Sequence, residues 1–436
     1  MKKSILFVFS IVVVLSMLLA ACATTPEEPT TPEVEEPEVE VEEPEPAPAA
    51  DSPGLQMDTA VVAPQFFSDE EYELSRQLME NQPLNPEDPI YLQYLLEDPV
   101  SLADYPQYEA KEPPYNICFS NAGVNNPWRV VGWVTMGEQV LQLQEEGLIG
   151  NFFHVDAQGN DEKQIADIQD LINTPGKCDL LIVSPNTSEA LTPVVEQACD
   201  VLPVLVFDRF VLTDCAAINA RPIGGYAFGI AGAEFIVDTL GAEGGNVLAF
   251  RILPGVDVLE QRWGAARKIF EENPQLNIIG VEFVAYDSFV ANTVVTDYLA
   301  KFGQIDAVWM DAGGTAVTIL EAFEDAGMDY PKAMVGEDQN DYLLFWQDKG
   351  LTAIAPTFPT YQWRHAILAS VMFLQGETVQ HNWVLPQIPV TEENLDFYAN
   401  PEMPPLHYAQ CGCEDMVNFP DAWINVDVSK YDRLND

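Results

Sequence analysis

From Tyr115 onward, short apolar runs alternate with longer amphipathic segments, and this alternation constrains the fold more than any other feature. The run Ile117-Cys118-Phe119 is followed by a segment with helical spacing near 128–145. The same order, an apolar run and then a helical segment, recurs up to about residue 326. Such repetition is typical of parallel sheets covered by helices on both faces. The length of the repeat predicts an α/β protein with two such sheets.

Polar residues concentrate where the expected strands end. In open α/β sheets, ligands bind beyond the carboxyl ends of the strands, so these loops are the candidate site. Motifs follow expected strands at Asn125-Asn126-Pro127-Trp128, Asp156-Ala157-Gln158-Gly159-Asn160, Ser184-Pro185-Asn186, Val206-Phe207-Asp208-Arg209 and Val335-Gly336-Glu337-Asp338. A further motif, Gln261-Arg262-Trp263-Gly264, opens an expected helix.

Taken together, these motifs resemble the sugar-binding type I periplasmic binding proteins, the ribose- and galactose-binding group that serves ABC importers. The resemblance covers about residues 115–395. It implies two doubly wound parallel-sheet lobes joined by a hinge of three chain crossings. The expected organisation is an N-terminal extension at 51–114, an N-terminal lobe at 115–221 plus 358–381, a C-terminal lobe at 222–357 plus 382–395, and a C-terminal extension at 396–436.

A sugar presents hydroxyls that donate and accept hydrogen bonds, together with apolar C–H faces, so its site needs charged groups and aromatic plates. Asp208 and Arg209 place an acceptor beside a donor, and Trp128 can stack on a ring. Core packing for Trp128 and a surface ion pair for Asp208 and Arg209 are the competing interpretations. The full set of expected ligand-binding residues is Asn126, Trp128, Ser184, Asp208, Arg209, Arg262, Tyr286, Asp311 and Asp338.

Some of these assignments depend on the resemblance alone. Asp338 matches the family's second-lobe Asp, and Arg262 matches its helix-borne Arg, although a solvated helix position is the alternative for Arg262. Tyr286 is a weaker second plate whose alternative is a core position. The family's Asn position falls on Ala312, so Asp311 is expected to replace the missing amide contact.

The first residues resemble a bacterial lipoprotein signal peptide. Met1-Lys2-Lys3 is a positive start, Ile5 to Leu19 is mostly apolar, and Leu19-Ala20-Ala21-Cys22 follows. The resemblance implies cleavage of residues 1–21 and acylation of Cys22. Residues 23–50 hold ten Glu, seven Pro and no Lys or Arg, so we expect 22–50 to be an extended tether.

The formal net charge of −50 argues against nucleic acid as a partner, because phosphate binding needs clustered Lys and Arg. Contact with the membrane is expected only through the lipid anchor. The four His are scattered, and no nucleophile-elbow, zinc or Walker pattern is present, so we expect no enzyme activity, no metal and no cofactor.

Six cysteines besides Cys22 allow 15 sets of three disulfides. Cys199 and Cys215 flank one strand and are the favoured pair. Cys411-Gly412-Cys413 with His407 is the only metal-like cluster in the sequence, but exported cysteines more often form disulfides. We expect Cys411 and Cys413 to tie the C-terminal extension to another part of the chain.

The sequence thus predicts a monomeric, extracytoplasmic solute-binding protein, anchored by lipid to the cell membrane. It would capture a sugar or a related polyol or nucleoside between its lobes and deliver it to ABC permease subunits. A sensor that presents the closed form to a receptor kinase or chemoreceptor is the alternative.

Overall fold

A computed structural model gives the structure of residues 57–82 and 84–435. The predicted signal peptide at 1–21, the lipidation site Cys22 and the acidic segment at 22–50 lie outside the described residues. The start of the N-terminal extension, up to residue 56, does so as well.

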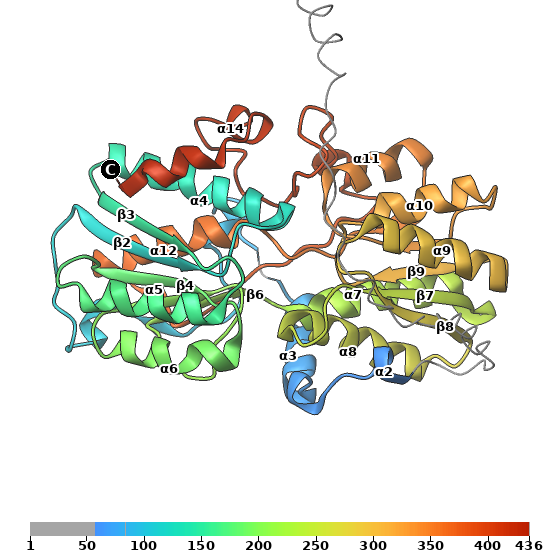
Figure 1. The fold of residues 1–436 in the computed structure, drawn as a ribbon, viewed down its shortest axis with the longest axis horizontal. Coiled ribbons are helices and arrows are strands. Elements are labelled where there is room, and N and C mark those ends of the chain that lie inside the picture. Colours follow the sequence, from blue (N-terminus) through green and yellow to red (C-terminus); the bar gives the residue numbers. More distant parts are fainter. Residues whose placement is uncertain (1–56, 83, 436) are drawn as a thin grey trace, which may run out of the picture. The chain divides into compact units, whose positions relative to one another are not determined.

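The N-terminal lobe is built on a six-stranded sheet in which all neighbouring strands run parallel (Figure 1). The spatial order is β13-β6-β5-β4-β2-β3. The strands are β2 (Tyr115–Asn121), β3 (Ile149–Asp156), β4 (Leu180–Ser184), β5 (Val204–Phe207), β6 (Ile218–Pro222) and β13 (Asn382–Leu385). Helices α4 (Pro127–Glu145) and α12 (Gln362–Leu374) cover one face, and α5 (Asp161–Asn173) and α6 (Ser188–Cys199) cover the other.

The C-terminal lobe repeats this architecture with a five-stranded parallel sheet in the order β11-β10-β9-β7-β8. Its strands are β7 (Gly245–Arg251), β8 (Leu276–Phe283), β9 (Ala307–Met310), β10 (Ala333–Val335) and β11 (Ala353–Ile354). Helices α7 (Gly225–Leu240) and α8 (Asp257–Glu272) lie on one face. Helices α9 (Ser288–Phe302), α10 (Ala316–Asp325) and α11 (Asn340–Lys349) lie on the other. The predicted fold of two doubly wound parallel-sheet lobes is therefore confirmed.

The chain passes between the lobes after β6, after β11 and after β13. The assignment of residues 382–395 to the C-terminal lobe was wrong for β13, which pairs in parallel with β6 of the N-terminal sheet. Trp383 and Leu385 are apolar, and they bury in the N-terminal core. The third crossing therefore falls after Leu385, and Val390 then pairs with Ala355.

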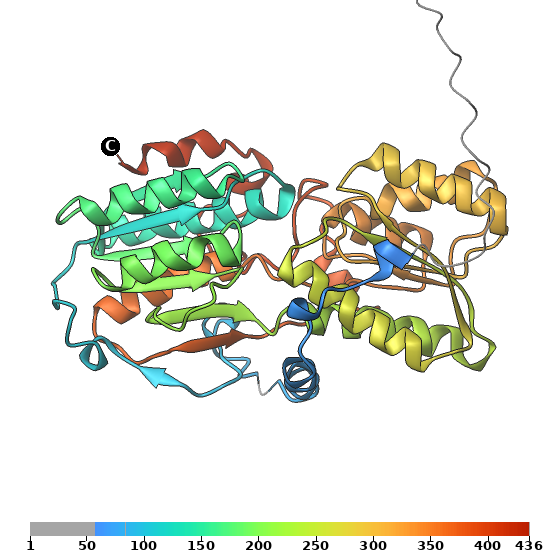
Figure 2. The ribbon, with the colours of Figure 1, turned by 60° about the horizontal axis from the view of Figure 1, so that its bottom comes forward.

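The N-terminal extension packs on both lobes (Figure 2). It contains α2 (Met57–Ala60), α3 (Asp69–Glu80), short 3-10 turns, and β1 (Pro99–Val100), which pairs antiparallel with β12 (Val379–Gln380). Ser68 caps α3, and Tyr72 buries in the C-terminal lobe, whereas Tyr91 buries in the N-terminal lobe. The apolar residues at 90–96 form only a 3-10 turn, Ile90–Leu92, and Pro86, Pro89 and Pro99 flank this stretch on both sides.

The C-terminal extension also contacts both lobes. It carries α13 (Leu395–Tyr398), α14 (Asp421–Ile424) and a final 3-10 segment (Val428–Asn435). Near its start, the backbone N–H of Asn340 in α11 donates to the carbonyl of His407 at 2.8 Å. Near its end, the Tyr431 hydroxyl donates to Glu138 of α4 at 2.8 Å. The extension therefore runs from the C-terminal lobe to the N-terminal lobe.

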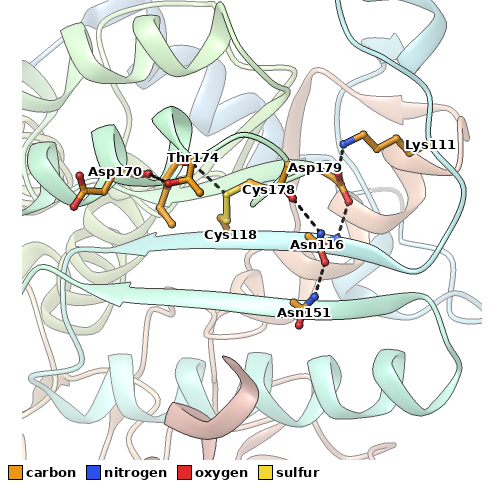
Figure 3. The surroundings of a disulfide bond; sticks show 10 residues. Lys111, Asn116, Cys118, Asn151, Asp170, Thr174, Cys178 and Asp179 are labelled. Carbon is orange, nitrogen blue, oxygen red and sulfur yellow. Dashed lines mark hydrogen bonds and ion pairs between the residues drawn. A yellow bond between two sulfur atoms is a disulfide. The ribbon is translucent and has the colours of Figure 1, made fainter. Parts of the chain in front are cut away.

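Three disulfides join the six described cysteines. Cys118 of β2 bonds Cys178, which precedes β4, and Figure 3 shows the adjacent ladder in which the Asn116 backbone N–H donates to Asp179. Cys199 is bonded to Cys215, the pair that the sequence favoured. Cys411 and Cys413 are bonded to each other, so the expectation that they tie the extension to another part of the chain was wrong.

Candidate functional site

A cavity of about 410 Å³ lies between the two lobes, at the ends of the strands. Its walls come from loops that are far apart in the sequence, as the parallel topology requires. Residues of the N-terminal lobe that line it are Ala122, Asn125, Asn126, Pro127, Trp128, Arg129, Asn186, Thr187, Asp208 and Arg209. Residues of the C-terminal lobe that line it include Leu253, Leu259, Arg262, Ala285, Tyr286, Ala312, Gly314, Glu337 and Gln339. Phe358 of the second crossing and Tyr408 of the C-terminal extension complete the lining.

Asp208 is the centre of the N-terminal wall. Its Oδ2 accepts from Arg129 at 2.6 Å and from the Ser184 hydroxyl at 3.1 Å. Arg129 and Asp208 are only 4% and 8% exposed, and burial lowers the pKa of Arg129 while Asp208 opposes that shift. Both bonds reach Oδ2, so neither of them occupies the second carboxylate oxygen of Asp208.

Asp208 directly follows β5 and has a φ of +71°, a left-handed conformation that is uncommon for residues other than glycine. Ala285 and Tyr286, which follow β8 in the other lobe, have φ values of +48° and +59°. Backbone strain of this kind collects at functional sites, where the surrounding structure holds it in place. Both walls of the cavity therefore carry left-handed residues at the end of a strand.

Arg209 lies beside Asp208 and donates to the backbone carbonyl of Asn186. Among the described residues, no carboxylate lies within ion-pair distance of its guanidinium, so the remaining donors can face a ligand. Asn126 caps α4 by accepting from the Arg129 backbone N–H at 2.9 Å. Trp128 lines the cavity, and its indole N–H donates to the carbonyl of Phe358 at 2.6 Å.

Arg262 is the centre of the C-terminal wall. Its guanidinium lies 4.0 Å from the ring centroid of Phe228 and donates to Glu337 Oε1 at 3.3 Å. It also donates to the backbone carbonyl of Asp311. The two walls thus each hold a buried arginine–carboxylate pair, and Tyr286, a residue that is 40% exposed, adds an aromatic side chain.

Six of the nine expected ligand-binding residues line the cavity: Asn126, Trp128, Asp208, Arg209, Arg262 and Tyr286. Ser184 does not line it, because its hydroxyl lies behind Asp208 and bonds that carboxylate.

Asp311 does not line the cavity either, and its two carboxylate oxygens are buried without a hydrogen-bond partner. Burial raises its pKa to about 7. Asp338 faces the C-terminal extension and accepts from the Gln410 backbone N–H at 2.8 Å. Burial, and then the charge of Glu337, raise the pKa of Asp338 to about 7.

Seven polar side chains of the lining were absent from the expected set: Asn125, Arg129, Asn186, Thr187, Glu337, Gln339 and Tyr408. Glu337 was missed because it neighbours Asp338, and successive residues of an extended chain point to opposite sides. Arg129 lies in the first turn of α4, just after the motif Asn125-Asn126-Pro127-Trp128. No local pattern marked Tyr408, because it belongs to a segment far along the chain.

His407, Cys411 and Cys413 form a buried cluster whose potential ligand atoms lie within 4.8 Å of one another. Because the two sulfur atoms are bonded to each other, neither is a thiolate that could bind a metal. Burial lowers the pKa of His407 to about 4. In the part of the chain that the structure describes, no helix combines the length and apolar character that a membrane span requires.

Comparison with known proteins agrees with this geometry. The family described as a periplasmic binding protein domain matches residues 117–378. The ribose import binding protein of Bacillus subtilis is 27% identical over 283 residues, covering 63% of this chain and 87% of that protein. The D-allose-binding periplasmic protein of Escherichia coli is 29% identical over 131 residues, covering 30% of this chain and 39% of that protein.

Solved structures share the fold. An ABC transporter solute binding protein from Thermobispora bispora has a TM-score of 0.59 and 26% identity, covering 70% of this chain and 95% of its own. A Bacillus halodurans solute binding protein solved with bound myo-inositol has a TM-score of 0.59 and 19% identity, covering 67% and 99%. With two parallel-sheet lobes, three crossings and a matched domain over more than half of its length, the chain belongs to the periplasmic binding protein family, in its type I form.

Proposed function

We propose that this protein is an extracytoplasmic solute-binding protein that captures a monosaccharide or a related polyol or nucleoside and delivers it to an ABC importer. The observation that carries the proposal is the cavity itself, in which each lobe supplies a buried arginine–carboxylate pair and an aromatic side chain. The relatives named for ribose and allose support a sugar as the ligand class.

The residues of the two walls suit a ring that carries several hydroxyls. Asp208 and Glu337 accept from hydroxyl donors, whereas Arg209 and Arg262 donate to hydroxyl oxygens. The C–H face of a sugar ring packs on an aromatic plate, and Trp128 is placed to provide one. A ligand that contacts both walls at once favours the closed arrangement of the lobes, because it binds that state more tightly.

Capture in this proposal is passive, so binding is stoichiometric and the sugar is recovered unchanged. The lining has no His or Cys, and each of its two carboxylates is paired with an arginine. An ABC permease is the expected recipient, and we propose that the protein acts as a monomer.

A thermal-shift screen of monosaccharides, polyols and nucleosides tests the function. A ligand at 100 times its dissociation constant adds about 2.7 kcal/mol to the free energy of unfolding, which is readily measured. Calorimetric titration should then give one binding site per chain, and chromatography should return the sugar intact. Consumption of the sugar without stoichiometric binding would replace this proposal with an exported enzyme.

We also propose that Cys22 carries lipid and that residues 22–50 hold the folded part away from the membrane. Mass spectrometry of the protein from its native membrane should show acyl chains on Cys22. Cys22→Ser should release the protein into the soluble fraction. Retention of this variant on the membrane would show that another segment makes the attachment.

A further inference from the structure

The C-terminal extension reaches the cavity through one short segment. Residues 407–410 run antiparallel beside the loop after β10, and Tyr408 pairs with Gln339 in an isolated bridge. The Ala409 backbone N–H donates to the Asp338 carbonyl at 2.9 Å, and the Gln410 backbone N–H donates to the Asp338 carboxylate at 2.8 Å. These bonds hold the position of Tyr408, which lies outside the matched domain at 117–378.

The Tyr408 side chain is 3% exposed and lines the cavity. Its hydroxyl donates to Glu337 Oε2 at 3.1 Å. The same oxygen accepts from the Gly313 backbone N–H at 3.1 Å, and Oε1 accepts from Arg262 at 3.3 Å. Three donors therefore orient Glu337, and one of them comes from the C-terminal extension.

The loop after β9 cannot supply hydrogen-bonding side chains to this part of the wall. Ala312 and Gly314 line the cavity without polar side-chain atoms, and Asp311 is fully buried and does not line it. The Tyr408 hydroxyl is next to this loop, because both it and the Gly313 N–H reach Glu337 Oε2. Its hydrogen is committed to Glu337, which leaves the phenol oxygen able to accept a hydrogen bond.

We propose that Tyr408 is a ligand-binding residue, and that the C-terminal extension thereby completes the sugar site. This inference rests on the proposed function. The Tyr408 oxygen and Glu337 form two adjacent acceptors beside the Arg262 donors, an arrangement that fits two neighbouring hydroxyls of a sugar ring. Burial, and then the charge of Glu337, raise the pKa of Tyr408, so the phenol keeps its proton and remains a donor to Glu337.

Titration calorimetry with D-ribose, D-allose and myo-inositol on the wild-type chain, Tyr408→Phe and Tyr431→Phe tests the inference. Tyr431 is the matched control, because it lies in the same extension and its hydroxyl also donates to a glutamate, Glu138, but it does not line the cavity. Tyr408→Phe should weaken binding of the sugar that the wild type holds by about tenfold or more. Tyr431→Phe should leave that affinity unchanged.

Monodeoxy analogues of the bound sugar separate direct contact from a structural effect. If Tyr408 accepts from one hydroxyl, Tyr408→Phe should have little effect on the analogue that lacks that hydroxyl and its full effect on the others. Equal weakening for every analogue, or unchanged affinity for the parent sugar, overturns the inference and leaves the proposed function standing. Failure of the wild type to bind any of the three sugars overturns the inference, while the broader ligand screen decides the proposed function separately.

Discussion

The two walls of the cavity are built in different ways. In the N-terminal wall, Asp208 accepts hydrogen bonds from Arg129 and Ser184, and all three residues belong to the N-terminal lobe within the matched domain. In the C-terminal wall, Arg262 and Tyr408 both donate hydrogen bonds to Glu337, and Tyr408 comes from the C-terminal extension. The N-terminal wall is thus complete within its own lobe. The C-terminal wall includes Tyr408, which lies beyond the matched domain at 117–378.

The largest expected effect comes from breaking the N-terminal wall at its centre. Asp208→Ala leaves Arg129 buried without its carboxylate, and loss of one partner from a buried pair costs about 3–5 kcal/mol. The variant should lower the free energy of unfolding of the ligand-free protein by that amount and should also weaken sugar binding at least about tenfold. Denaturant unfolding and calorimetry measure the two effects.

Asp208→Asn is the matched control for this change. Asparagine tolerates the left-handed φ of +71° and can still accept from Arg129, so its stability loss should be clearly smaller than that of the alanine variant. If Asp208→Ala is as stable as the parent, the buried ion pair does not hold the N-terminal wall together.

The two lobes also differ in their disulfides. Two of them cross-link the N-terminal lobe, whereas the described residues of the C-terminal lobe at 225–354 contain no cysteine. With sequence separations of 60 and 16, loop entropy predicts losses of about 4 kcal/mol for Cys118–Cys178 and about 3 kcal/mol for Cys199–Cys215 when each is replaced by a serine pair.

Hydrogen exchange on the reduced protein locates this effect. Exchange of backbone amides should accelerate in β2 and β4 of the N-terminal sheet, while amides in β7 and β9 should be little affected. Equal acceleration in both sheets would mean that the lobes unfold as a single unit.

Much of the architecture could be predicted because it depends on local patterns. Apolar runs that alternate with amphipathic segments specify strands and helices one by one, and parallel topology then brings the ends of the strands together. For that reason Asp208 and Arg209 could be assigned to the cavity without a structure, whereas Arg262 was assigned through the family resemblance. The strand β13 was assigned to the wrong lobe, because its partner β6 lies far back in the chain and no pattern within 382–385 indicates which sheet it joins.

The remaining errors have the same origin. In the loop after β10, Glu337 lines the cavity whereas Asp338 does not, and the Asp338 carboxylate instead accepts from the Gln410 backbone N–H. Asp311 was expected to replace an amide, but its side chain points away from the cavity, which only the path of the loop after β9 reveals. Residues whose position depends on distant segments could not be assigned from the sequence.

The buried acids behind the C-terminal wall predict a dependence of stability on pH. Burial raises the pKa of Asp311 to about 7, well above its ordinary value of 3.8. A raised carboxyl pKa means that the folded state binds the proton more tightly, so stability is fully present below about pH 4 and is lost as the pH rises to about 7. Asp311→Asn should reduce this slope by about 1.4 kcal/mol per pH unit.

Urea unfolding of the ligand-free protein at pH 5, 6 and 7 measures the slope. Asp348→Asn is the control, since the Asp348 side chain is 79% exposed. An unchanged slope in Asp311→Asn would indicate that this carboxyl finds a partner in solution. It would also show that the C-terminal wall, which holds a buried arginine–carboxylate pair as the N-terminal wall does, has no protonated Asp311 behind it.

The smallest expected effect concerns Trp128, where the N-terminal wall meets the second crossing. Its indole N–H donates to the Phe358 carbonyl at 2.6 Å, and its ring lies in the lining of the cavity. Trp128→Phe removes the hydrogen bond but keeps an aromatic face, so it should cost about 1 kcal/mol of stability and change sugar affinity by less than about fivefold.

Trp128→Ala also removes the plate and should weaken binding further, while the order of preference among sugars persists because the hydroxyl contacts of Asp208 and Arg262 remain. Calorimetry on both variants separates these contributions. If Trp128→Phe binds the sugar as weakly as Trp128→Ala, Trp128 contributes to binding through its hydrogen bond to the crossing segment and not through stacking on the sugar.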